Sequence, residues 1–416
     1  MMIKFSRFTL GNGLRVMVHE DRSTPLAAMN VLYDVGSRDE NPELTGLAHL
    51  FEHLMFGGTP EIPDFDTELQ LAGGENNAFT NSDVTSYYIT LPKENIETGF
   101  WLESDRMNLL DFSQKNLDVQ KNVVIEEFNQ RYVNRPYGDA LLKLRPLTYK
   151  VHPYRWPTIG RDVSHIRNCS LDDIRDFFFS HYAPDNAVLS LAGNITPDRA
   201  FMLAEKWFGG IERRNIKPRS IPSEPEQTGK RGLTIRGKVP APAIYKAWHM
   251  GSRLDADYYT LDLITDLLAG GESGRLYAKL VREKRLFSSI DAYITSDTDP
   301  GLIIIHGKLM QGTDMRLAEE SLNKMIDDLK EKLPSHPEME KVKNKYESSA
   351  LFENTSILNK AMHLAYFELL GNPEMINTET ERYMSVERSE ISETAARYFR
   401  DSNSSTLLYL PGKTVK

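Results

Sequence analysis

The chain repeats one order of landmarks, and this repeat constrains its fold more than any other feature. Gly36-Ser37-Arg38 follows a strand-like stretch and precedes a helix-like stretch that ends at Gly57-Gly58. Gly251-Ser252-Arg253 begins the same order, which ends at Gly270-Gly271. The Gly-Ser-Arg turns are 215 positions apart and the Gly-Gly ends 213. A chance match of three residues would not explain the shared order. We therefore predict an internal duplication that gives two α+β halves.

A linker separates the predicted halves. Residues 210–230 contain three prolines and few apolar side chains, which is typical of an extended connection between domains. We predict a first domain over residues 1–209, the linker over 210–230 and a second domain over 231–416. The length of 416 residues agrees with two or three domains.

Hydrophobic periodicity predicts the elements of both halves. In the first half we expect a helix that starts at the cap Asn41 and ends at Phe56. The acidic stretch 39–43 is then a solvated turn that leads into this helix. We expect strands at 8–19 (turning at 11–13), 26–34 and 76–91 and helices at 64–72, 94–110, 114–133, 170 onward and 197–208. Further strands are expected at 187–193, 231–238 and 243–250.

Composition excludes several classes of protein. The net charge of −9 argues against nucleic acid or an anionic membrane as the main partner. No stretch approaches 18 apolar residues, so no membrane span is expected. The single cysteine, Cys169, excludes an internal disulfide and removes thiolate zinc ligands from consideration. The N-terminal residues show no targeting pattern, so we expect a cytoplasmic location.

One helix of the first half carries a metal-binding pattern. His49, Glu52 and His53 stand at i, i+3 and i+4, so the two imidazoles and the carboxylate share a face of the helix. Neutral imidazoles suit Zn²⁺, and a zinc held by three protein ligands keeps a fourth position for water. Glu52 is then placed to take a proton from that water. The H-x-x-E-H order is the inverted zinc-peptidase signature.

A third ligand is expected from the helix at 114–133. Val123, Val124, Glu127 and Phe128 share one face, which places Glu127 on the buried side and Glu126 toward solvent. We predict Glu127 as the third zinc ligand. The alternative is a buried ion pair between Glu127 and an arginine. His152, His181 and Cys169 stand in surroundings that favour structural roles.

These residues resemble the pitrilysin/insulinase (M16) family of zinc peptidases, in the short-chain branch that includes the mitochondrial processing peptidases. His49-x-x-Glu52-His53 is followed by Glu127 after 74 residues. Further landmarks of that branch span nearly the whole chain: Gly46-Leu47-Ala48, Gly73-Gly74, Asn77-Ala78-Phe79-Thr80, His152-Pro153-Tyr154, Gly270-Gly271, Ser273-x-Arg275-Leu276 and Arg282-Glu283-Lys284.

The resemblance implies a zinc metalloendopeptidase made of two homologous α/β-sandwich domains that form a clamshell. His49, His53 and Glu127 then bind zinc, and Glu52 is the general base. Peptides or unfolded segments are bound as an added strand along Asn77, Ala78 and Phe79. As an alternative, Asn77 only shapes the turn after Gly74. The second half has Leu263, Asp266 and Leu267 at the zinc positions and cannot bind the metal there.

Two departures from the family pattern affect the expected partners. Relatives often have a glutamate that supports the zinc site, and this chain has Gln120 at that position. We expect Gln120 to alter this support. The family also uses an arginine and a tyrosine seven positions apart to bind substrate. Arg282 matches the arginine, but the tyrosine position holds Ser289. We therefore expect a heterodimer with a homologous subunit that supplies this pair. A homodimer in which Tyr293 or Ser289 stands in is the alternative.

Two other functions fit this sequence less well. A non-catalytic structural or assembly subunit of the same fold is disfavoured by the intact His49, Glu52, His53 and Glu127. A zinc hydrolase of small non-peptide substrates would have a closed pocket in place of an exposed strand edge.

Overall fold

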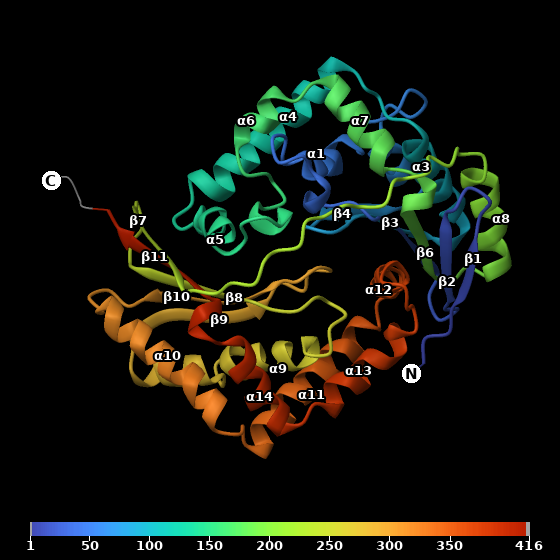
Figure 1. The fold of residues 1–416 in the computed structure, drawn as a ribbon. Helices are drawn as coiled ribbons and strands as arrows, with labels where there is room; N and C mark the ends of the chain where they lie inside the picture. Colours follow the sequence, from blue (N-terminus) through green and yellow to red (C-terminus); the bar gives the residue numbers. More distant parts are fainter. Residues whose placement is uncertain (1, 413–416) are drawn as a thin grey trace. The chain divides into compact units, whose positions relative to one another are not determined.

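The computed structural model describes residues 2–412 and divides the chain into two compact units. Unit 1 contains residues 1–128, 156–221 and 350–379, and unit 2 contains residues 129–155, 222–349 and 380–416. Each unit contains one β-sheet with helices packed against it (Figure 1). The predicted α+β class with two sheets is confirmed.

The sheet of unit 1 has six strands in the order β1-β2-β6-β3-β5-β4. Strand β2 runs parallel to β6, and the other neighbours are antiparallel. Strand β4 therefore forms one edge of this sheet. The strands are β1 Ser6–Thr9, β2 Arg15–Glu20, β3 Leu26–Tyr33, β4 Glu75–Thr80, β5 Thr85–Pro92 and β6 Ala187–Gly193.

The sheet of unit 2 repeats this topology without a counterpart of β1. Its order is β7-β11-β8-β10-β9, with β7 and β11 parallel and the other neighbours antiparallel. The edge strand β9 thus corresponds to β4. The shared strand order is what an internal duplication predicts. The strands are β7 Arg231–Gly237, β8 Ala243–His249, β9 Phe287–Ile294, β10 Leu302–Leu309 and β11 Ser404–Pro411.

Helices cover both faces of each sheet. In unit 1, Figure 1 shows α1, α3 and α7 on one side of the strands and α12 on the other. In unit 2, α5 lies on one side and α9, α10 and α14 on the other. The helices are α1 Leu47–Leu54, α2 Phe65–Leu71, α3 Ile96–Asn108, α4 Gln114–Phe128, α5 Ala140–Thr148, α6 Val163–Asn168, α7 Leu171–His181, α8 Pro197–Phe208, α9 Tyr258–Ala269, α10 Met315–Glu331, α11 His336–Glu353, α12 Ile357–Leu369, α13 Met375–Ser385 and α14 Arg388–Tyr398.

Each unit takes one of these covering helices from the other half of the sequence. Helix α12 packs against β2, β3 and β6 through Ala361, Leu364 and Ala365. Helix α5 packs against β8 and β11 through Ala140 and Leu144. Small or branched apolar side chains at these positions allow close packing on the pleated sheet. The compact units therefore differ from the predicted domains, residues 1–209 and 231–416, in two segments. Residues 129–155, which include α5, belong to unit 2, and residues 350–379, which include α12, belong to unit 1.

Two predicted elements of unit 1 are wrong. The stretch 76–91 forms two antiparallel strands, β4 and β5, because Asn81 turns the chain between them. The Asn81 side-chain oxygen accepts hydrogen bonds from the backbone N–H groups of Asp83 and Val84. The helix expected from Asn41 begins only at Leu47, so His49 lies in its first turn and not in its middle.

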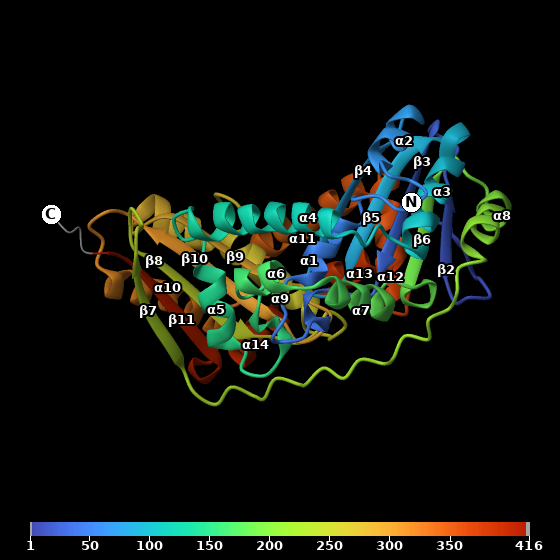
Figure 2. The ribbon, with the colours of Figure 1, turned by 90° about the horizontal axis from the view of Figure 1, so that it is seen from above.

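The linker forms neither helix nor strand over residues 212–228, and side chains hold each end of it. Arg219 pairs with Asp34 and Asp39 in unit 1. Glu224 accepts hydrogen bonds from the backbone N–H groups of residues 150, 151 and 152 in unit 2, at 2.8 to 3.0 Å. Figure 2 shows the linker as a long extended segment.

Replacing Glu224 by alanine should lower the free energy of unfolding by about 1–3 kcal/mol, because three backbone donors lose their acceptor. The matched control is Glu226→Ala, two residues further on. Glu226 is exposed and pairs with Arg400 across 3.3 Å, so its loss should cost less than about 1 kcal/mol. Urea unfolding of both variants measures the difference, and equal effects would show that Glu224 does not anchor the linker.

No helix within residues 2–412 combines the length and the apolar character needed to cross a bilayer.

Candidate metal centre

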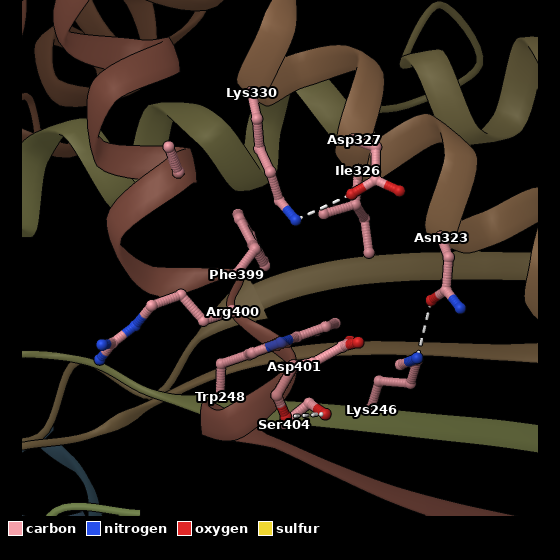
Figure 3. Close-up of a pocket in the computed structure, with 11 residues that line it drawn as sticks. Lys246, Trp248, Asn323, Ile326, Asp327, Lys330, Phe399, Arg400, Asp401 and Ser404 are labelled. Carbon is pink, nitrogen blue, oxygen red and sulfur yellow. Dashed lines mark hydrogen bonds and ion pairs between the residues drawn. The ribbon is translucent and has the colours of Figure 1, made fainter. Parts of the chain in front are cut away.

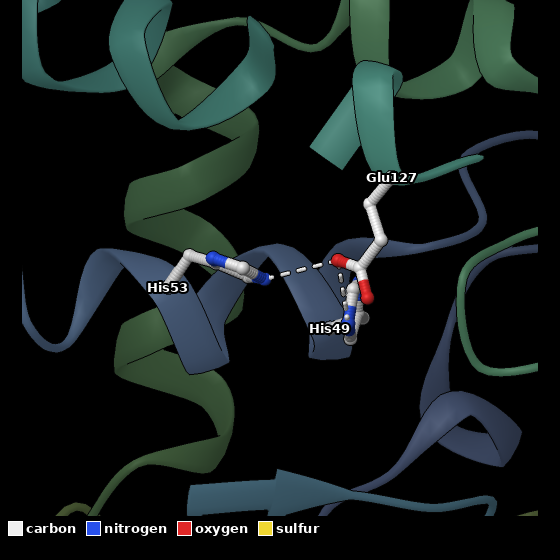
Figure 4. A group of neighbouring side chains, drawn as sticks. All are labelled: His49, His53 and Glu127. Carbon is white, nitrogen blue, oxygen red and sulfur yellow. Dashed lines mark ion pairs between the residues drawn. The ribbon is translucent and has the colours of Figure 1, made fainter. Parts of the chain in front are cut away.

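The predicted ligands converge on one point of unit 1. The Nε2 atoms of His49 and His53 lie 3.6 and 3.5 Å from the same carboxylate oxygen of Glu127 (Figure 4). All three ligand atoms lie within 4.8 Å of one another. Helix α1 supplies the histidines and α4 supplies the glutamate. The alternative prediction for Glu127, an ion pair with an arginine, stays a prediction.

The spacing of these three atoms fits a zinc ion. Zinc–nitrogen bonds of about 2.0–2.1 Å place two ligands of a tetrahedron about 3.3–3.4 Å apart. The His49–Glu127 and His53–Glu127 separations are close to that value and longer than a good hydrogen bond. Two imidazoles and a carboxylate are also a common donor set of zinc sites that leave one position for water. The chemistry and the spacing of these residues therefore agree with the predicted metal.

Burial decreases across the centre. His49 is buried, whereas the side chains of His53 and Glu127 are 26% and 19% exposed. The neighbouring Glu126 is exposed, as predicted. Val123 was predicted on the buried face, but it is exposed, and the buried residues of α4 are Leu117, Val124 and Phe128. The centre is thus closed at His49 and accessible at His53.

Glu52 lies on α1 next to the edge strand β4. Burial raises the pKa of its carboxyl group, while Thr80 and the His53 imidazole favour the charged form. The charge of Glu127 acts in the same direction as burial. A carboxylate with a raised pKa is a better proton acceptor than an exposed one, as a general base requires. Thr80 was not predicted as a site residue, because only the fold brings it to Glu52.

Glu40 holds the start of the helix that carries both histidines. One oxygen of its carboxylate accepts a hydrogen bond from the N–H of Gly46 and the other from that of Ala48, each at 2.9 Å. Gly46 has φ = 95°, and a Cβ atom there would lie 2.7 Å from the carbonyl oxygen of Ile159. Glu40 is buried, so the prediction of a solvated acidic turn is wrong for this residue. Residue type alone does not distinguish Glu40 from its acidic neighbours.

Stability should depend on pH through Glu40. Burial raises its pKa to about 8 from 4.5, against the opposing effect of the Gly46 and Ala48 N–H groups. Between these values the folded chain keeps a proton that the unfolded chain loses, so this contribution to stability falls as pH rises. The reference is Glu40→Gln, which stays neutral at every pH. The free energy of unfolding of the wild-type chain, minus that of this variant, should fall by at most about 1.4 kcal/mol per pH unit. Urea unfolding in the presence of a chelator, at several pH values, measures this difference in free energy. A difference that stays constant or rises with pH would contradict the prediction.

The residues predicted to bind substrate occupy both units. Asn77, Ala78 and Phe79 lie on β4, which is a sheet edge as the sequence predicted. The Asn77 side chain accepts a hydrogen bond from the Ala78 N–H. Arg282 is exposed on a π-helical turn, Tyr277–Glu283, of unit 2. The binding roles of these residues remain predictions.

Ser289 and Tyr293 lie four residues apart on the edge strand β9, so their side chains emerge from the same face of that strand. Gln120 lies two turns before Glu127 on α4. Cys169 is buried, which raises its pKa to about 11. His152 is also buried, next to Asp299 at 3.4 Å.

A pocket of about 360 Å³ lies in unit 2, between α10, the end of α14 and strand β8 (Figure 3). Its cations already have partners: Lys246 donates to Asn323 at 2.7 Å, and Lys330 pairs with Asp327 at 2.8 Å. The residues that line this pocket include none of the three predicted metal ligands. It is therefore not the closed metal pocket that a small-molecule hydrolase would require.

Comparisons with known proteins match both halves of the chain. The family model described as "Insulinase (Peptidase family M16)" matches residues 15–155, and the one described as "Peptidase M16 inactive domain" matches residues 168–346. The "inactive" match includes α9, where the predicted duplication places Leu263, Asp266 and Leu267 opposite His49, Glu52 and His53.

Similar proteins carry peptidase names. "Zinc protease PqqE" from Helicobacter pylori is 28% identical, with 98% of this chain and 93% of the relative covered. "Mitochondrial-processing peptidase subunit beta" from Caenorhabditis elegans is 27% identical over 58% of this chain and 51% of its own length. The crystal structure of a protease from Helicobacter pylori has a TM-score of 0.93 and 26% identity, and covers 99% of this chain and 100% of its own.

Proposed function

The chain belongs to the M16 (insulinase) family of peptidases, and from this premise we propose that it is a zinc metalloendopeptidase that cleaves peptides or unfolded segments. The convergence of the His49 and His53 Nε2 atoms on the Glu127 carboxylate carries the proposal. The names of its relatives, which include zinc proteases, support the same metal and reaction.

In the proposed mechanism the chain supplies the ligands, the base and the substrate edge. His49, His53 and Glu127 would hold Zn²⁺, which lowers the pKa of a bound water to about 7 and polarises a carbonyl group. The Glu52 carboxylate takes the proton of the attacking water and donates it to the leaving amine. Strand β4 offers an unpaired edge beside Glu52, where a peptide can add as a strand through main-chain hydrogen bonds.

The experiment that tests this proposal combines metal content with activity. Purified chain should contain about one zinc and should lose cleavage of a quenched fluorescent peptide when a chelator is added. Cleavage should return with Zn²⁺. A chain that binds no zinc at micromolar concentrations would refute the proposal and favour a structural or assembly subunit of the same fold.

We further propose that the active form is a heterodimer with a homologous subunit. Ser289 stands where the family has a substrate-binding tyrosine, so Arg282 lacks its usual companion on this chain. The relative named as a beta subunit supports a paired arrangement. A homodimer in which Tyr293 or Ser289 stands in for the tyrosine is the alternative. Zinc-loaded chain that alone cleaves peptides, at rates that do not rise when a homologous subunit is added, would refute the heterodimer.

A further inference from the structure

A buried arginine lies in the core of unit 1. Arg106, on α3, is 1% exposed, and its partner Glu103 is 0% exposed. The two side chains form a bidentate pair, in which Nε donates to one carboxylate oxygen at 2.8 Å and Nη2 donates to the other. Among residues 2–412, Nη1 has no hydrogen-bond partner. Arginine is almost never buried this completely unless it is paired, so the presence of this pair needs a physical reason.

Three aromatic rings surround the guanidinium group of Arg106. Its central carbon lies over the ring of Phe56 at 5.0 Å from the ring centre, and over the rings of Phe65 and Tyr87 at 4.4 Å each. These distances allow cation–π attraction to all three rings. The rings come from the turn that follows α1, from the first residue of α2 and from strand β5. We call these three residues, together with Glu103 and Arg106, the arginine cage.

Two members of the arginine cage are hydrogen-bonded to the backbone of the helix that carries the predicted ligands. The Tyr87 hydroxyl group donates to the carbonyl oxygen of Phe51 at 3.2 Å. That carbonyl belongs to the peptide bond that joins Phe51 to Glu52. The N–H group of Phe56 donates to the carbonyl oxygen of His53 at 3.1 Å. The cage therefore contacts α1 directly beside the proposed base and beside one proposed ligand.

Stability alone does not explain the buried ion pair of the arginine cage. Removing two charges from water costs free energy that their mutual attraction returns only in part, so apolar side chains of similar size would stabilise the core as well or better. A planar cation adds something that apolar side chains lack, because it attracts the faces of the surrounding rings and favours particular orientations of them. The pair is therefore better explained by the orientation of the rings, and of the helix bonded to them, than by stability.

We propose that Arg106 is a positioning residue, which fixes α1 through Phe56 and Tyr87 and so preorganises the metal centre. This inference rests on the proposed zinc site and adds to it a residue that acts on the centre only through other side chains. Residues that support metal ligands from outside typically contribute about 10–100-fold to metal affinity or activity. Because Arg106 acts on a whole helix and not on one ligand, we expect an effect at the lower end of this range.

The test removes both charges of the arginine cage together. Glu103→Leu/Arg106→Met leaves no unpaired charge in the core, so the free energy of unfolding of the zinc-free chain should stay equal to that of wild type or rise. Zinc affinity should fall about tenfold. Urea unfolding in excess chelator measures the first quantity, and competition with a chromophoric chelator measures the second. Unchanged zinc affinity would overturn the proposal, and so would a loss of affinity that accompanies a loss of stability.

A second variant decides the question if the double variant does not fold. Tyr87→Phe keeps the ring in the arginine cage and removes only the hydroxyl group. The Phe51 carbonyl oxygen still accepts the N–H of Met55 at 3.0 Å, so no buried group loses its last partner and stability should change little. Zinc affinity should fall about threefold, the factor that corresponds to one weak neutral hydrogen bond. A zinc affinity equal to that of wild type would refute positioning through Tyr87.

The control replaces another ion pair that includes a buried cation. Lys246 and Glu319 pair across 3.2 Å in unit 2, whereas the predicted ligands belong to unit 1. Lys246→Met/Glu319→Leu makes the corresponding exchange of two charges for two apolar side chains and should keep the zinc affinity of wild type. If it lowers zinc affinity as much as Glu103→Leu/Arg106→Met does, the arginine cage has no special role and the proposal fails.

These measurements separate the positioning role from the proposed function, because zinc binding and unfolding need no peptide cleavage. A tenfold loss of zinc affinity at unchanged stability in Glu103→Leu/Arg106→Met supports the role of Arg106 even if the wild-type chain cleaves nothing. If wild type cleaves peptides and the double variant binds zinc equally tightly, the role of Arg106 fails while the proposed function stands. A wild-type chain that binds no zinc would overturn both.

Discussion

Replacing Glu52 by glutamine is expected to lower kcat for every cleaved peptide by about 10²–10⁴-fold, the contribution typical of a positioned general base. Glutamine has nearly the same shape but cannot take a proton from water. His49, His53 and Glu127 are unchanged, so zinc content should stay at about one per chain. Steady-state kinetics and metal analysis of the same preparation measure both quantities.

The control for this variant is Glu61→Gln, which removes the same charge from an exposed residue of unit 1. It should keep both zinc and activity. If Glu52→Gln retains more than about a tenth of wild-type kcat, another group is the base. If it loses zinc, Glu52 belongs to the ligand set and the assignment of Glu127 has to be revised.

Replacing Glu127 by glutamine is expected to lower zinc affinity by more than about 100-fold. Loss of a residue that only supports a zinc ligand lowers metal affinity by up to about 100-fold, and loss of a ligand itself should have a larger effect. The variant loses a charged ligand, whereas the fold should persist because Glu127 is partly exposed and α4 is anchored by Val124 and Phe128. Competition with a chromophoric chelator measures the affinity, and circular dichroism checks the fold.

The adjacent residue offers a close control. Glu126→Gln makes the same chemical change on the same helix but at an exposed position, and it should leave zinc affinity and activity unchanged. Equal zinc affinities of the Glu127 and Glu126 variants would show that the third ligand lies elsewhere.

The grouping of His49, His53 and Glu127 could be predicted because most of its geometry is local. His49, Glu52 and His53 lie within one turn and a half of a helix, and their spacing fixes a common face wherever the helix begins. Glu127 followed from the buried stripe of a second helix, although Val123 proved to lie outside that stripe. The edge position of Asn77, Ala78 and Phe79 followed from the resemblance to the family.

The errors lie where residue type alone does not decide between two competing local structures. Asn41 is a good helix cap by type, yet the buried Glu40 holds the helix start and delays it to Leu47. Asn81-Ser82-Asp83 did carry a turn signal, but strand-forming residues on both sides of it suggested one strand. Helix α5 was missed because Pro146 is a helix breaker by type; it lies two residues before the helix ends, and the helix forms without the backbone hydrogen bond that Pro146 cannot donate.

The exchange of α5 and α12 has a consequence for the integrity of the protein. A protease that cuts the extended linker would not release two separate halves. The N-terminal fragment would still contribute α5 to the sheet of unit 2, and the C-terminal fragment would still contribute α12 to the sheet of unit 1. Each fragment alone would expose an apolar sheet face to water, with an aggregation hazard as the result. The duplicated halves have become interdependent, so neither is expected to serve as a stable, separately expressed domain.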